Sequence, residues 1–241
     1  MNITKIVELL EDLKAEDLRK RVAAVKGLDK IAEVFGVEKT KTMLLPFLKE
    51  FEDDEEEVML ELAKQMLFLG RYINENGTGV IELVPHFFVL LNYEDLSVIN
   101  EAMRSLEGLV RAFSISHESI LQLAKRLLGI NSCKAAISAV KICCQLAHAV
   151  PNKFAADVSK IISDSAGHKA TLVRKETASA LRFLLEEASP YESLASSTIK
   201  KLLKDAQESV RVAAVESITF RRFPKPYFTT SFHGLLLPLL E

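Results

Sequence analysis

The stretch Glu208-Ser209-Val210-Arg211-Val212-Ala213-Ala214-Val215-Glu216-Ser217-Ile218 determines how the rest of the chain is interpreted. Ala214, Val215 and Ile218 follow Arg211 by three, four and seven positions. This spacing places them on one face of an α-helix. The same frame recurs upstream at intervals of 37 to 40 residues. Its anchor positions are Arg21, Met59, Ile99, Ala136, Arg174 and Arg211.

A period near forty residues with two helices per period is typical of HEAT and armadillo repeats, in which each unit packs only on its neighbours. The sequence therefore predicts an all-α, right-handed α-solenoid of HEAT repeats, an armadillo-like superhelix. Residues 1–222 are predicted to form six repeats, and residues 223–241 a loop and a partial seventh repeat. The expected repeats are about 2–36, 37–76, 77–114, 115–150, 151–189 and 190–222.

Local signals refine this expectation. Gly36 is expected to end a helix that begins near Leu18, because glycine adopts positive φ without strain. Pro46 and Pro85 are expected to bend the first helices of repeats two and three. Pro190, after Ser189, predicts a helix start in repeat six. Asn2 and Ser116 are expected to cap helices, and Ala178 and Val215, which share a frame position, are expected to be buried.

Charge, hydropathy and cysteine spacing argue against several classes of function. The net charge of −2 provides no overall attraction for nucleic acid or an anionic membrane. No segment is long and apolar enough to predict a membrane span, and no secretory signal is expected at the start. Cys133, Cys143 and Cys144 show no metal-binding spacing. They are interpreted as reduced thiols of a cytoplasmic protein, with the nucleus as an alternative compartment.

A search for catalytic chemistry finds none in the sequence. The histidines are scattered, and none pairs with a cysteine or carboxylate at ligand spacing. Cys143-Cys144 is interpreted as a buried apolar pair rather than a nucleophile. No glycine-rich phosphate loop, metalloprotease helix or serine elbow is present. We therefore expect no catalytic residues, no metal site, no cofactor and no enzymatic activity.

Charged residues allow two interpretations each. The acidic run from Glu50 to Glu57 is either a solvated turn that stabilises the next helix or a docking point for a basic partner. Arg174 and Arg211 either pair with acidic residues of adjacent turns, such as Glu208, or face a partner. Pairing is favoured, because arginine suits partly buried ion pairs.

Several stretches resemble a known family. Gly36–Thr40, Leu44–Leu48 and Asp54–Gln65 closely resemble the first two repeats of the scaffolding (65 kDa regulatory) A subunit of protein serine/threonine phosphatase 2A. Ser209–Glu216 is similar to the sixth repeat of that family, and the resemblance runs in order from Ile3 to about Ile218. It implies a non-catalytic scaffold whose intra-repeat turns bind a regulatory subunit.

The resemblance also implies site residues. By position, the binding ridge comprises Asp54, Glu55, Glu94, Asp95, Ser132, Cys133, Thr171, Leu172, Lys175 and Glu208, to which the acidic run adds Glu56 and Glu57. The family has a Trp-Phe pair where Ser132-Cys133 stands, and a proline where Thr171 stands. Loss of an aromatic anchor weakens an interface, so the identity of the partner stays open.

The family's arrays are longer than six repeats, and their C-terminal repeats hold the catalytic subunit. The chain is either a divergent short relative or the product of a truncated or mis-predicted gene. The resemblance therefore implies that the partner is a regulatory subunit, whereas the catalytic subunit is expected to bind poorly. The alternative function is an unrelated HEAT-repeat adaptor or a transport-receptor-like protein-binding scaffold.

Overall fold

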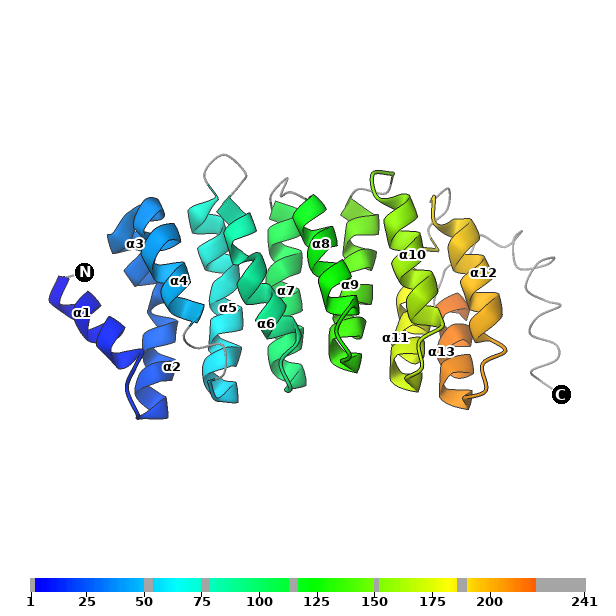
Figure 1. Ribbon diagram of the computed structural model, residues 1–241, viewed down its shortest axis with the longest axis horizontal. Helices are drawn as coiled ribbons and strands as arrows, with labels where there is room; N and C mark the ends of the chain where they lie inside the picture. Colours follow the sequence, from blue (N-terminus) through cyan, green and yellow to red (C-terminus); the bar gives the residue numbers. More distant parts are fainter. Residues whose placement is uncertain are drawn as a thin grey trace. The chain divides into compact units, whose positions relative to one another are not determined.

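The computed structural model describes residues 3–49, 54–74, 79–112, 117–149, 152–185 and 190–219. Every regular element in these ranges is a helix, which confirms the all-α class (Figure 1). The chain divides into two compact units, Met1–Gln145 and Leu146–Glu241. The boundaries of the six repeats stay a prediction.

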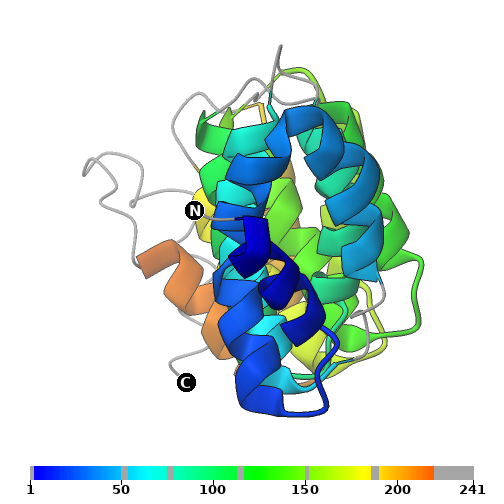
Figure 2. The same cartoon turned by 90° about the vertical axis from the view of Figure 1, so that its left-hand side faces the viewer.

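The first unit consists of successive helices joined by short turns. They are α1 (Ile3–Asp12), α2 (Leu18–Lys26), α3 (Leu28–Lys39), the π-helix η1 (Thr40–Leu44), α4 (Leu45–Leu48), α5 (Glu56–Ile73), the 3-10 helix η4 (Gly79–Leu83), α6 (Val84–Leu91), α7 (Leu96–Ala112), α8 (His117–Leu128) and α9 (Cys133–Ala149). Helix α2 packs on α5, α5 on α7 and α6 on α8. Figure 2 faces the N-terminal helices, where α1 lies in front of α2.

Helices α5 and α7 form the centre of the first unit. In α5 the buried residues include Met59, Leu62, Ala63 and Met66, which is the predicted frame, together with Val58, Leu69 and Ile73. Helix α7 buries the equivalent positions Val98, Ile99, Ala102, Met103 and Leu106. Burial extends over two flanks of each helix because each has a neighbour on both sides. The predicted repeat frame thus identifies the core of this unit.

The second unit contains α10 (Ala155–Ala166), α11 (Thr171–Ala180), the 3-10 helix η5 (Leu181–Phe183), α12 (Glu192–Leu202) and α13 (Glu208–Thr219). Helix α11 packs on α13 and α10 packs on α11. Helix α13 buries Val210, Ala213, Ala214, Ser217 and Ile218. Val215 is only half-buried, although Ala178 is fully buried. The expectation was therefore wrong for Val215, which lies at the edge of the buried face that these five residues form.

Helix boundaries match the sequence signals in part. Gly36 has φ 76°, which confirms a backbone break there. The predicted helix from Leu18 to Phe35 is nevertheless interrupted at Gly27, where a Cβ would lie 3.0 Å from Leu9 Cδ1. A larger residue at this position would therefore have to displace the end of the Leu9 side chain of α1.

Pro46, Pro85 and Pro190 lie at or just before the start of a helix. Pro46 is the second residue of α4 and Pro85 the second residue of α6, and each of these helices follows a short helix of a different type. They mark a change of helix type rather than a bend inside one α-helix. Pro190 precedes α12, which begins at Glu192, so the predicted start was two residues early. Asn2, Ser116, Ser189 and residues 223–241 lie outside the described residues.

Candidate protein-binding site

The candidate site consists of the turns that join the two helices of each pair. We call them the turn segments: residues 13–17, 54–55, 92–95 and 129–132 in the first unit, and 167–170 and 203–207 in the second. Within each unit, side chains connect one turn segment to the next. These connections determine which of the predicted site residues remain available to a partner.

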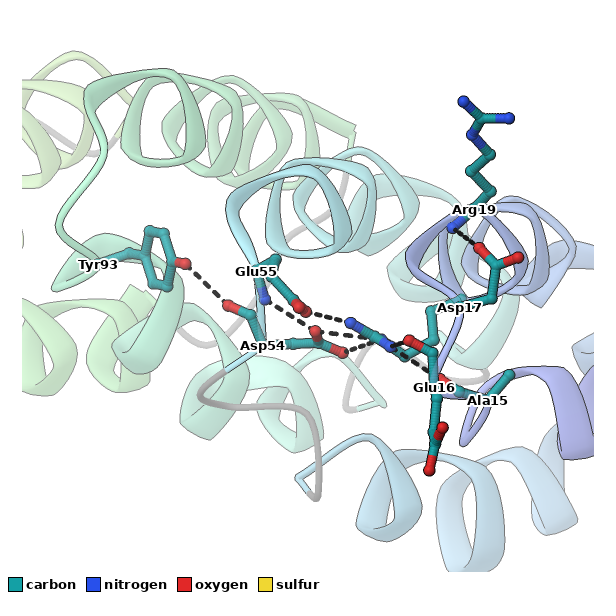
Figure 3. A network of polar contacts seen from close by, with 8 residues as sticks. Ala15, Glu16, Asp17, Arg19, Asp54, Glu55 and Tyr93 are labelled. Carbon is teal, nitrogen blue, oxygen red and sulfur yellow. Dashed lines mark hydrogen bonds and ion pairs between the residues drawn. The ribbon is translucent and has the colours of Figure 1, made fainter.

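Arg21 connects the first two turn segments. Its Nε donates to the Asp54 carboxylate at 3.1 and 3.2 Å, and its Nη1 donates to the carbonyls of Ala15 and Glu16 at 2.7 and 2.9 Å. Its Nη2 pairs with Glu55. Figure 3 shows these carbonyls and carboxylates converging. The Arg21 and Asp54 side chains are only 12% and 10% exposed, so this guanidinium is a structural crosslink.

Two carboxylates share this guanidinium. Burial raises the pKa of Asp54, and contact with Glu55 adds to the effect. Contact with Asp54, followed by contact with Arg21, lowers the pKa of Glu55 to about 2. Glu55 therefore carries its charge at the surface, while Asp54 points inward and is not available to a partner.

The second and third turn segments are connected by hydroxyl groups. Tyr93 Oη donates to the carbonyl of Asp54 at 2.8 Å, and Ser97 Oγ donates to Glu56 at 3.3 Å (Figure 3 shows Tyr93). Asp95 begins α7 by accepting from the Ser97 backbone N–H at 2.6 Å, and its contacts with Ser97 lower the pKa of Asp95. Asp95 is thus a helix cap.

The third and fourth turn segments are connected by Lys134, whose Nζ donates to the carbonyl of Glu94. Ser138, one turn further along α9, donates to the carbonyl of Leu91 at 3.1 Å. Both bonds satisfy carbonyls at the end of α6 or just after it, which lack intrahelical partners. The Glu94 side chain stays exposed.

In the second unit, Arg174 repeats the role of Arg21. Its Nε and Nη2 donate to Asp205 at 2.7 and 3.0 Å, and its Nη1 donates to the carbonyls of His168 and Lys169 at 2.9 and 3.1 Å. The contact with Arg174 lowers the pKa of Asp205. Asp205 also accepts from the Gln207 backbone N–H at 2.9 Å, just before α13. The Arg174 guanidinium therefore connects two turns and orients Asp205, the residue that caps α13.

Arg211 forms the same bonds to two backbone carbonyls. Its Nη1 donates to the carbonyls of Asp205 and Ala206 at 2.8 and 3.1 Å. The predicted pairing of arginines with acidic turn residues is thus confirmed for Arg174, with Asp205 as the partner in place of Glu208. Glu208 is exposed as the first residue of α13.

The structure places the predicted site residues in two groups. Asp54, Asp95, Ser132 and Thr171 are half-buried; Glu55, Glu56, Glu57, Glu94, Cys133, Leu172, Lys175 and Glu208 are exposed. Several of them lie in helices rather than in turns, which corrects the prediction. Glu56 and Glu57 form the first turn of α5, Cys133 begins α9, and Thr171, Leu172 and Lys175 belong to α11. Residues 50–53 of the acidic run lie outside the described part.

Sequence reasoning missed the residues that connect the turns. Arg21 was recognised only as a frame anchor, and neither Tyr93 nor Asp205 was singled out. A usable signal was present, because an aspartate follows the anchor arginine by 33 residues in one case and by 31 in the other. This separation is slightly less than one repeat, and it carries the aspartate into the turn of the neighbouring pair.

Two titratable side chains outside the turn segments, those of His86 and Cys144, are buried. His86 is buried in α6, and burial, followed by the charge of Lys49, lowers its pKa to about 4. Burial raises the pKa of Cys144 to about 12, which keeps it protonated and unreactive. Within the described ranges, no group of three or more metal-binding side chains is arranged to hold an ion. No described helix is long and apolar enough to cross a membrane.

Curated proteins with similar sequences share one description. The chain is 37% identical over 107 residues to the regulatory A subunit of protein phosphatase PP2A from Saccharomyces cerevisiae, covering 44% of this chain and 17% of that protein. It is 34% identical over 143 residues to the alpha isoform of the 65 kDa regulatory A subunit of phosphatase 2A from Arabidopsis thaliana, covering 57% and 24%. The human beta isoform is 37% identical over 108 residues, covering 42% and 17%. No family model matches the chain.

Solved structures give a weaker likeness. An engineered protein covers 91% of the chain with a TM-score of 0.48 and 21% identity. A designed armadillo repeat protein in complex with the peptide (KR)4 covers 89%, with a TM-score of 0.48 and 20% identity. A likeness at this level identifies no family. The sequence comparisons, in contrast, confirm the resemblance: this chain, which spans about a fifth of the length of the curated relatives it matches, is similar to the scaffolding A subunits of protein phosphatase 2A.

Proposed function

We propose that the chain is a non-catalytic scaffold in a phosphatase 2A-type complex, and that its turn segments and the adjoining helix starts bind a regulatory subunit. The observation that carries this proposal is the crosslinking of neighbouring turns by Arg21, Tyr93 and Lys134 in the first unit and by Arg174 in the second. The descriptions of the relatives as regulatory or scaffold subunits support the same role.

Crosslinked turns favour binding because they are preorganised. Arg21 and Asp54 hold two successive turns in a fixed spacing before any partner arrives. When a partner contacts several turns at once, the turns therefore lose less conformational entropy than independent loops would lose. The polar residues that connect the turns therefore fix the positions of the turns. Their exposed neighbours make the contact with the partner.

The exposed neighbours in the first unit are mainly acidic. Glu56, Glu57 and Glu94 are exposed around the second and third turn segments, and Leu96 beside them is 62% exposed. Exposed carboxylates attract a basic partner surface and chiefly raise the association rate. Leu96 offers an apolar contact of the kind found at interface centres. Ser132 and Cys133 contribute less, because neither is an aromatic anchor.

The absence of catalysis is part of the proposal and rests on the relatives, which are regulatory subunits by description. The similarity also favours this role over that of an unrelated HEAT adaptor, which no observation supports. A cytoplasmic or nuclear compartment is proposed from the reduced cysteines.

The test is a binding measurement with a purified phosphatase 2A regulatory subunit from the source organism. The variant Glu56→Lys/Glu57→Lys/Glu94→Lys reverses the exposed charges around the turns and leaves the Arg21 crosslink intact. The control Glu33→Lys/Glu82→Lys/Glu118→Lys changes the net charge equally at exposed positions elsewhere. We expect the first variant to lower the association rate at least about tenfold at low salt, with the difference shrinking as salt increases.

At about 0.15 M salt the control is expected to bind within about twofold of the unchanged chain, since charges more than about 8 Å from the interface are then screened. Equal losses in both variants would remove the turns from the interface. Absence of any binding by the unchanged chain would overturn the proposed partner.

A further inference from the structure

A row of basic residues runs across the second helices of the first unit. Lys26, Lys64, Arg104 and Lys141 each stand five positions after a frame anchor, on α2, α5, α7 and α9. We propose that this face, which we call the basic face, binds an extended acidic segment of a partner protein. The inference goes beyond the proposed function, because it concerns the sides of the helices rather than the turns.

The helical register explains why these residues are exposed together. Positions one, five, eight and twelve after an anchor share one stripe of an α-helix, opposite the stripe that enters the core. The twelfth position adds Arg71 on α5 and Arg111 on α7. The side chains of Lys64, Arg104 and Arg111 are 47%, 75% and 74% exposed. Lys26 and Arg71 are also exposed, and Lys141 is half-buried.

The helices that carry the row are neighbours. Helix α2 packs on α5 and α5 on α7. The bond from Ser138 to the Leu91 carbonyl, at 3.1 Å, places α9 against the end of α6 that leads into α7. Figure 1 shows α2, α5, α7 and α9 following one another in this order. One basic residue of the row is therefore presented at each step from helix to helix.

Glutamates on the same helices only partly balance these charges. Lys64 pairs with Glu61 at 3.0 Å, Arg104 with Glu101, and Arg111 with Glu107. The side chains of these glutamates are 9%, 18% and 37% exposed, so each lies deeper than its basic partner. Exposed pairs of this kind are weak, and the cation remains able to bind a second carboxylate. In each of these three pairs on α5 and α7, the more exposed charge is therefore the positive one.

The spacing of the row indicates the form of the occupant. Packed helices lie about 8–10 Å apart, and an extended chain advances about 3.3 Å per residue. An extended segment that crosses the helices therefore meets one basic residue about every third position. Leu60 and Ile137, half-buried at the first stripe position, offer apolar contacts between the charges. This combination fits a protein segment with a carboxylate at about every third residue and apolar side chains between. It fits a nucleic acid strand less well, because phosphates follow one another about every 3.4 Å and offer no apolar side chains.

The inference is tested on the intact chain by fluorescence anisotropy at low salt. The probe is a labelled peptide of four Glu-Thr-Val triplets, and the comparison peptide has the same composition with its glutamates consecutive. We expect the spaced peptide to bind at least about tenfold more tightly than the clustered one. We expect Lys64→Glu/Arg104→Glu to weaken its binding at least about tenfold, because two attractions become repulsions.

The matched control is Lys39→Glu/Lys160→Glu, which changes the net charge equally at exposed lysines of α3 and α10. It is expected to bind within about twofold of the unchanged chain. Equal weakening by both double variants, equal binding of both peptides, or no binding of the spaced peptide would each overturn the inference. Displacement of the peptide by a single-stranded oligonucleotide at an equal or lower concentration would overturn the choice of a protein segment. None of these results depends on the turn segments, so the proposed function is tested separately.

Discussion

At the scale of single residues, Arg21, Arg174 and Arg211 perform one task. Each donates from Nη1 to the carbonyls five and six positions before it, and the first two also pair with an aspartate of the next turn. A lysine has no rigid fork of donors and cannot form these bonds together. The guanidinium geometry, rather than the charge alone, therefore holds the turns in place.

Arg174→Ala tests this role. The change leaves two carbonyls and Asp205 without their donor at a site where the two side chains are 16% and 11% exposed. A fully buried pair costs about 3–5 kcal/mol to break, so we expect roughly 2 kcal/mol at this partly solvated site, measured by urea unfolding. Arg174→Lys should recover less than half of the loss. Arg104→Ala is the control, because its pair with Glu101 lies within one helix and is expected to contribute less than about 0.5 kcal/mol. A loss in Arg174→Ala as small as the control would contradict the role.

His86 gives a prediction about pH. Its pKa is about 4 in the folded chain, against an ordinary value of 6.5. Between these values the unfolded chain binds a proton that the folded chain does not, so acidification from pH 6.5 towards 4 favours unfolding. The difference between the two pKa values corresponds to roughly 3 kcal/mol at the acidic end.

The measurement is the free energy of unfolding across this range for the unchanged chain, His86→Leu and the control His148→Leu, which removes an exposed histidine. At each pH, the unfolding free energy of the variant is subtracted from that of the unchanged chain. This difference no longer contains the contribution of the carboxylates, which both proteins share. We expect a flatter profile for His86→Leu alone. Parallel profiles for all three proteins would show that His86 is protonated in the folded state.

At the scale of the elements, α5 and α7 approach each other through two glycines. A Cβ on Gly70 would lie 2.5 Å from Leu109 Cδ2, and a Cβ on Gly108 would lie 2.9 Å from Leu67 Cδ1. Leu109 is fully buried, whereas Leu67 is half-buried, so its side chain can shift towards solvent. The two sites have similar contacts in the structure, but they differ in how easily the neighbouring leucine can shift.

Gly70→Ala and Gly108→Ala are therefore expected to differ in sign. Alanine gains about 1 kcal/mol over glycine inside a helix, but overpacking a core costs about 1–3 kcal/mol. We expect Gly70→Ala to lower the unfolding free energy by roughly 1–2 kcal/mol, and Gly108→Ala to leave it unchanged or raise it slightly. Equal effects of the two changes in urea unfolding would show that both leucines adapt equally.

These elements also show what the sequence could predict. The frame of α5 and α7 was readable because apolar side chains follow the helical period, and the break at Gly36 was readable because glycine favours positive φ. The interruption at Gly27 was not, because a single glycine is also tolerated inside a helical pattern. Val215 was misplaced because its exposure depends on which neighbours cover α13.

The positions of the turn segments were predictable from the sequence, but the contacts of their side chains were not. The resemblance located the turns, and the acidic residues around them are exposed as expected, apart from Asp54 and Asp95. Asp54 turns inward because its partner Arg21 stands 33 residues before it, a contact that exists only once the two helix pairs are stacked. Local sequence rules describe single helices, and they do not specify which side chains meet across a stack.

At the scale of the whole molecule, the central claim is that the turn segments and the helix starts beside them bind a regulatory subunit. Hydrogen–deuterium exchange, with and without the purified subunit, tests it most directly. The first backbone N–H groups of a helix have no intrahelical acceptor. Those without a side-chain cap, unlike the Ser97 N–H that is bonded to Asp95, exchange quickly in the unbound chain and report any partner that covers them. We predict protection on binding at residues 54–57, 94–97 and 132–134 and unchanged exchange in α4, α6 and α8. Protection confined to α4, α6 and α8, or binding that leaves the turn segments unprotected, would contradict the account.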